Sequence, residues 1–84
     1  MAVAHMGSIA GYVMVVRPFQ DKFNVLVRLA GAIDCLDPDV DLHPSVDEAK
    51  KQGCRRVAIE LGLHPEVGES LAAGVPWVTV DVSA

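Results

Sequence analysis

The C-terminal half of the chain contains two segments that look like copies of one unit. Leu42-His43-Pro44-Ser45-Val46-Asp47-Glu48 begins residues 42–61, and Leu63-His64-Pro65-Glu66-Val67-Gly68-Glu69 begins residues 63–82. Each segment then reaches a glycine at the same offset and continues into an apolar run that ends in an acidic residue. Self-similarity at a fixed period indicates a repeated structural unit, which here is a short helix followed by a strand.

The segment before the repeats predicts a β-hairpin. Residues 10–17 are rich in β-branched and aromatic side chains, which favours a strand that Pro18 ends. Residues 23–30 alternate apolar and polar side chains with a period of two, as a half-buried strand does. The polar residues between the two runs are few enough for a hairpin turn.

Local signals set the expected bounds of the repeated elements. Pro44 suits the first position of a helix, and Ser45 followed by Glu48 matches a capping box. We expect one helix from residue 44 to Gly53 and a strand over 55–61, then a helix over 65–73 and a strand over 75–82.

The predicted fold is therefore an α/β domain, with α+β as an alternative. Its element order is ββαβαβ: an N-terminal hairpin, then two helix–strand repeats whose strands run parallel, forming a four-stranded mixed sheet. Residues 1–8 include His5-Met6-Gly7-Ser8, which looks like a cloning scar, so we expect a disordered tag there and a single domain over 9–84.

The composition limits the classes of partner that the chain is expected to bind. Half of the 84 residues are apolar (51%), more than a small domain can bury, so we expect a homodimer or larger homo-oligomer, with a protein partner as a further option. The net charge of −4 argues against nucleic acid, which requires clustered basic residues. No run is long enough for a membrane helix, and two cysteines without metal spacing fit a cytoplasmic location.

Two histidines form the first candidate site. His43 and His64 both precede a predicted helix, so in a parallel arrangement both would lie at the carboxyl edge of the sheet. Asp41 and Glu66 would stand beside them, and histidine with carboxylate suits zinc or a small ligand. The alternative interpretation is that Leu-His-Pro simply starts a helix in each repeat.

An acidic stretch forms the second candidate site. Asp37, Asp39, Asp41 and Glu48 occupy positions 1, 3, 5 and 12 of an EF-hand-type calcium loop. Leu42 stands where that motif needs a glycine for its sharp turn, and Pro44 follows two positions later. The alternative is a solvated acidic turn that binds no cation.

The sequence gives no support for nucleophilic catalysis and contains no cofactor motif. There is no G-x-S-x-G motif and no glycine-rich phosphate loop. Cys54 has two arginines after it, which can activate a thiol, but it lies at the start of an apolar run, and buried cysteines are usually inert.

Two short stretches resemble known families. EAKKQGCRRVAIELG and AGVPWVTVD resemble the second half of a small CoA-binding Rossmann-type domain, whose phosphate-binding first half has no counterpart here, so CoA binding is not implied. VLVRLAGAID is similar to the second strand of STAS domains, but their Asp-Ser-Ser-Gly stretch is missing after Leu61.

Taken together, these features predict a small non-catalytic binding or regulatory module that acts through a sheet face or edge and through self-association. A metal- or ligand-binding protein, or an enzyme, that uses His43, His64 and nearby acids stays open as an alternative. A fragment or engineered domain without a selected function is the third.

Overall fold

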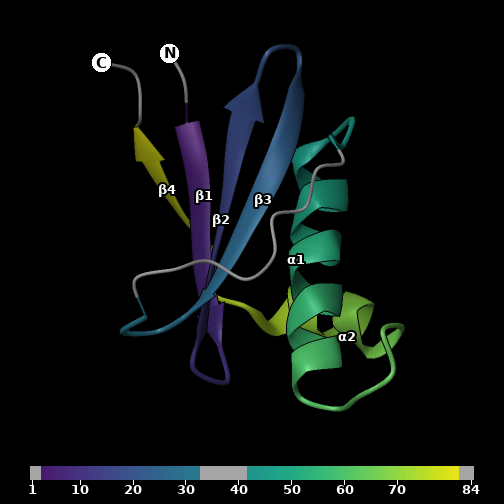
Figure 1. Cartoon of the computed structure of the whole chain (residues 1–84). Helices are drawn as coiled ribbons and strands as arrows, with labels where there is room; N and C mark the ends of the chain where they lie inside the picture. The colour runs from purple at the N-terminus through teal and green to yellow at the C-terminus, as the bar shows by residue number, and fades with distance from the viewer. Residues whose placement is uncertain (1–2, 33–41, 82–84) are drawn as a thin grey trace.

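The chain forms one four-stranded antiparallel sheet with two helices against it (Figure 1). The computed structural model describes residues 3–32 and 42–81. In chain order the elements are β1 (Val3–Ile9), β2 (Tyr12–Phe19), β3 (Lys22–Leu29), α1 (Val46–Glu60), α2 (Val67–Gly74) and β4 (Val78–Asp81). The strand order across the sheet is β3-β2-β1-β4, and all three neighbouring pairs are antiparallel.

Two tight hairpins produce the first three strands. Ile9 pairs with Tyr12 across a two-residue turn, Ala10-Gly11, in which both residues have positive φ. This is the pattern of a type I′ turn, whose twist matches that of the flanking strands. Phe19 pairs with Lys22 across a second two-residue turn, and β2 and β3 stay in register from there to Leu29.

Capping residues define α1 at both ends. The Ser45 side chain accepts a hydrogen bond from the Glu48 backbone N–H at 3.2 Å, so the predicted N-cap is confirmed. At the other end Gly62 has φ of +77°, and the Leu63 N–H donates to the Ala58 carbonyl at 2.8 Å. This is a Schellman motif, in which a left-handed glycine lets the chain satisfy the last helical carbonyls.

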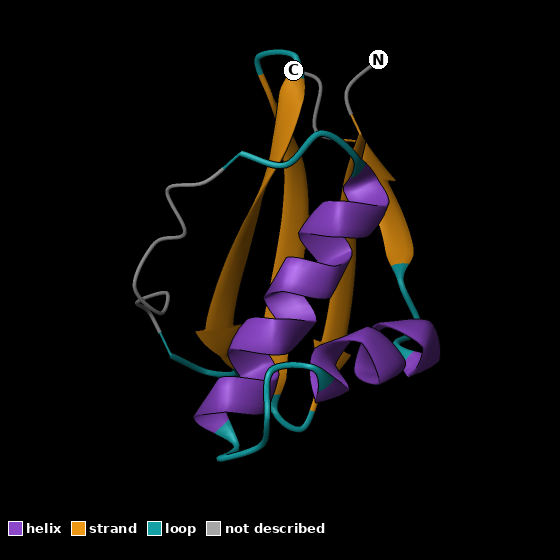
Figure 2. Cartoon of the chain, turned by 90° about the vertical axis from the view of Figure 1, so that its right-hand side faces the viewer, coloured by secondary structure: helices purple, strands orange, loops and turns teal. Residues whose placement is uncertain are grey.

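The two helices lie on one face of the sheet, as Figure 2 shows. The core between the layers is built from apolar side chains of the β2–β3 hairpin, α1 and the segment after α2: Met14, Val16, Val25, Val27, Ala49, Cys54, Val57 and Val75. The helix side of the sheet is thus buried and its other side carries no described helix.

Four strands, two helices and an N-terminal hairpin are confirmed in outline, but the fold is the α+β alternative and not the α/β domain that we expected. Its second half differs in detail, because residues 55–60, expected as a strand, are the C-terminal half of α1. The fourth strand is instead β1, and the sheet is antiparallel where we expected parallel pairs. Val3–Ser8, assigned from the sequence to a tag, lies in β1 and pairs on both sides.

Candidate functional site

The face of the sheet opposite the helices carries a row of apolar side chains that crosses all four strands. Met6 on β1 stands directly opposite Val15 on β2 and Val78 on β4, and Val15 stands opposite Leu26 on β3. Because side chains alternate along a strand, these four residues point away from the buried Met14 and Val16 side. The row is therefore continuous from one edge of the sheet to the other.

This row is accessible. Val78 is 58% exposed and Val80, its neighbour on the same face of β4, is 39% exposed. Met6, Val15 and Leu26 are half-buried. The uncovered face of an antiparallel sheet is normally polar, so an apolar row here indicates an interaction surface.

Positive charges flank the row. Arg17 on β2 and Arg28 on β3 are exposed and alternate onto the same face as Val15 and Leu26. No Asp or Glu occupies a strand position of this face in the part of the chain that the structure describes. The face is thus apolar in the middle and cationic toward both ends of the strands, although the whole chain carries −4.

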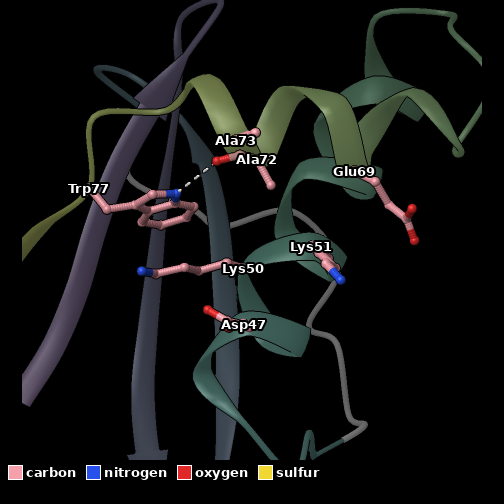
Figure 3. A pocket seen from close by; sticks show the side chains of 7 residues that line it. All are labelled: Asp47, Lys50, Lys51, Glu69, Ala72, Ala73 and Trp77. Carbon is pink, nitrogen blue, oxygen red and sulfur yellow. Dashed lines mark hydrogen bonds between the residues drawn. The ribbon is translucent and has the colours of Figure 1, made fainter.

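A groove lies on the helix side, between α1, α2 and the segment that leads into β4 (Figure 3). Its volume is about 250 Å³, below the range of pockets that take drug-sized ligands. Lining side chains come from the first turns of α1, from α2 and from the residue before β4: Asp47, Lys50, Lys51, Glu69, Ala72, Ala73 and Trp77.

Trp77 forms one wall of this groove and is held from three sides. Its indole N–H donates to the Ala72 carbonyl at 3.4 Å, and the Lys50 ammonium lies 5.1 Å from the ring centroid. Gly7 on β1 makes room for the indole, because a Cβ there would lie 2.8 Å from the Trp77 ring. Lys50 therefore makes a cation–π contact with Trp77, and the aliphatic part of the lysine side chain lies along the indole (Figure 3).

His5 borders the same region from β1. It pairs with Val16 and so faces the helices, where it is half-buried. Burial lowers the pKa of His5 below its ordinary value of 6.5, nearby Lys50 lowers it further, and Asp47 opposes the shift. The imidazole is consequently neutral at pH 7.

The structure does not bring the two predicted histidines together. His43 precedes α1, and its backbone N–H and C=O pair with Phe23 of β3 at 2.8 and 3.0 Å. His64 follows α1, whose 15 residues span about 22 Å. The histidines are therefore separated by the length of a helix, and the shared cleft that parallel repeats would create is not formed.

The acidic candidates divide into two groups. Glu66 lies beside His64 in the exposed loop, with 3.9 Å between the imidazole Nδ1 and a carboxylate oxygen. Glu48 sits in the first turn of α1, and Asp37, Asp39 and Asp41 fall outside the described residues. The calcium-loop hypothesis thus stays a prediction, while the described ranges hold no group of three or more metal-ligating side chains.

Cys54 is the described cysteine and is inert in this setting. It is fully buried in α1, with its sulfur 3.7 Å from the Met14 sulfur. Burial raises the pKa of its thiol to about 11, so the reactive thiolate is scarce at neutral pH. The expectation of a buried, unreactive cysteine is therefore met, although on a helix where we had expected a strand.

The groove and the apolar row were not found as sites from the sequence. Lys50 and Lys51 lie on the second turn of α1, over the groove, because α1 continues to Glu60 and does not end at Gly53. Trp77 packs partly against the core. The apolar row reaches β4 only because β1 pairs with β4, and no local sequence pattern predicts that pairing.

Comparison with known proteins found no matching family model, no similar curated protein and no similar solved structure. The antiparallel sheet also differs from the parallel arrangement that the Rossmann-type resemblance implies. Across the described ranges, neither α1 nor α2 has the length and hydropathy of a bilayer-crossing helix.

Proposed function

We propose that this chain is a non-catalytic binding module that self-associates through the uncovered face of its sheet. The observation that carries the proposal is the apolar row of Met6, Val15, Leu26 and Val78 on a face without helices. Sheets bury their apolar faces against a second layer, and the described helices supply that layer on one side only.

A second copy is the occupant that the shape of the row favours. A two-fold axis that lies in the plane between two facing sheets brings the row of one copy against the row of the other, so one patch serves both partners. The face measures on the order of 20 Å by 20 Å for four strands of this spacing, which gives an interface of roughly 800 Å² in total. Specific interfaces usually exceed about 1,000 Å², so we expect a weak, reversible dimer.

Sedimentation velocity over a concentration series tests this proposal. The wild-type chain is expected to shift from monomer to dimer between about 10 μM and 1 mM, a range typical of a small interface. Val78→Glu and Val15→Glu place a charge in the row and are expected to hold the chain as a monomer. Val78→Glu is the safer variant for folding, because Val78 is already 58% exposed.

Ile59→Glu is the matched control, since Ile59 is 53% exposed near the end of α1 and lies off the sheet face. It is expected to dimerise as the wild type does. A wild-type chain that remains monomeric at millimolar concentration, or a dimer that only Ile59→Glu dissociates, would rule out the sheet face as the interface.

The charges of the face favour a second candidate, which is a partner protein with an acidic, partly apolar segment. Arg17 and Arg28 flank the row, and the described strands place no acid on that face, so a segment with glutamates beside leucines is complementary to it. Titration of the monomeric concentration range with a Glu/Leu peptide, followed by amide chemical shifts, tests this. Chemical-shift changes that are confined to β1–β4 and that vanish in 0.5 M salt would support this second candidate. A titration without any chemical-shift change would rule it out.

A further inference from the structure

We propose that the groove between α1, α2 and Trp77 binds a small organic monocarboxylate with an apolar body. The groove lies on the helix side of the sheet, so the proposal is independent of the dimer face. It rests on the charge balance of the groove, on the chemistry of its walls and on its volume.

The charges of the groove leave one cation uncompensated. Glu69 is already paired with Arg55, whose guanidinium lies 3.1 Å from its carboxylate. Asp47 stands three positions before Lys50 and four before Lys51 on α1, so its single charge can offset only one of the two lysines, and the Lys50 ammonium also sits over Trp77. Lys51 has no ion pair or hydrogen bond among the described residues, so the groove attracts an anion.

The remaining walls are apolar. Ala72 and Ala73 of α2 line one side together with the Trp77 indole, and the lysine stems line the other (Figure 3). The small alanine side chains keep the groove open. A ligand with a flat or aliphatic body fits between these walls while its carboxylate meets the Lys51 ammonium.

The volume limits the size of the ligand. About 250 Å³ is the space of roughly eight water molecules, so a body of about ten heavy atoms fills it. A phosphorylated nucleotide is too large, whereas an aryl acetate is of the right size. An anion of this size bound by a single ammonium and short apolar contacts is expected to have a Kd on the order of 1 mM.

Phenylacetate is the probe that tests the proposal. Trp77 is the single tryptophan of the chain, so its fluorescence reports directly on the groove. We expect saturable quenching or enhancement by phenylacetate, with amide shift changes at residues 50–51 and 72–73. Neutral phenylacetamide and cationic phenethylamine have nearly the same shape and are expected to bind at least fivefold more weakly.

Two variants and a control locate the site. Lys51→Met keeps the stem but removes the charge, and it is expected to weaken phenylacetate binding about fivefold to tenfold, as loss of one charge-assisted contact does. Ala73→Leu fills the groove from an exposed position and is expected to abolish binding. Lys22→Met removes an exposed lysine at the start of β3, away from the groove, and is expected to bind as the wild type does.

Equal binding of phenylacetate and phenylacetamide would overturn the assignment of an anion. Unchanged affinity in both Lys51→Met and Ala73→Leu would overturn the location, and the absence of any saturable signal up to about 20 mM would overturn the site itself. The Val78→Glu monomer is expected to bind phenylacetate normally, so failure of the dimer face and failure of the groove are separately visible.

Discussion

Gly68 of α2 sits directly against the backbone of Arg55 in α1. A Cβ at Gly68 would lie 2.6 Å from the Arg55 nitrogen and 2.7 Å from its Cα, distances that no side-chain carbon adopts. The contact brings the two helices together and sets the Arg55–Glu69 ion pair beside it at 3.1 Å. Because α1 and α2 both line the groove beside Trp77, its width depends on this close approach of the two helices.

Gly68→Ala is therefore expected to destabilise the chain by about 1–3 kcal/mol, because backbone atoms of α1 cannot move aside as a side chain would. The free energy of unfolding in urea measures it. Gly74→Ala is the matched control: a Cβ there meets nothing within 4 Å, and alanine favours the helix, so its stability should be unchanged or slightly higher. Equal effects of the two variants would show that the close approach is not structural.

The turn between β1 and β2 stores backbone strain at Ala10. Its φ is +52°, a left-handed conformation that costs an alanine about 1 kcal/mol, and Gly11 follows at +85°. Ala10→Asn creates the Asn-Gly pair that type I′ turns favour, so we expect a gain of about 0.5–1 kcal/mol in unfolding free energy. Ala30→Asn, at an exposed position without positive φ, should change stability by less than about 0.5 kcal/mol.

Cys54 is expected to react with iodoacetamide only when the protein opens. Its thiol is fully buried and its pKa is raised to about 11, so at pH 8 the native protein should be labelled at least roughly 100-fold more slowly than in urea. Mass spectrometry of the Cys54 peptide distinguishes this thiol from Cys35. Labelling as fast in the native protein as in urea would show that α1 does not bury the thiol.

His5 is expected to make stability depend on pH. Its folded-state pKa lies below 6.5, so the unfolded chain takes up a proton first as the pH falls. The stability that the neutral imidazole contributes is complete above about pH 6.5 and is lost progressively below it, down through the lowered pKa. Unfolding free energies at pH 7.5, 6 and 5 should therefore fall more steeply in the wild type than in His5→Gln. Parallel slopes in the two proteins would contradict this role of His5.

The local signals of the sequence located several elements well. The period-two pattern over 23–30 and the short polar turn before it predicted the β2–β3 hairpin, which spans Tyr12–Leu29. Both Leu-His-Pro stretches do precede helices, and Ser45 caps α1 as expected. These features depend on residues close to one another in the chain, so local sequence patterns are sufficient to predict them.

The prediction of a strand over 55–61 is wrong, and it shows where inference from local sequence patterns failed. Gly53 looked like a helix stop, yet it lies inside α1, where the missing side chain lets the helix approach the sheet: a Cβ there would lie 2.9 Å from Val25. The buried residues Ala49, Gly53, Cys54, Val57 and Ala58 follow helical spacing, a signal that the apolar run hid. The true stop is Gly62, with its left-handed φ.

The amino-acid sequence by itself determined the hairpin, the helix starts and the surplus of apolar residues, because turn chemistry, capping and side-chain periodicity act over a few residues. Only the tertiary structure decided that β1 pairs with β4, that His43 and His64 lie at opposite ends of α1, and that Lys50 meets Trp77. Strand partners and helix contacts join residues far apart in the chain, so they are chosen by the packing of the whole domain. The apolar row and the groove are consequences of that packing.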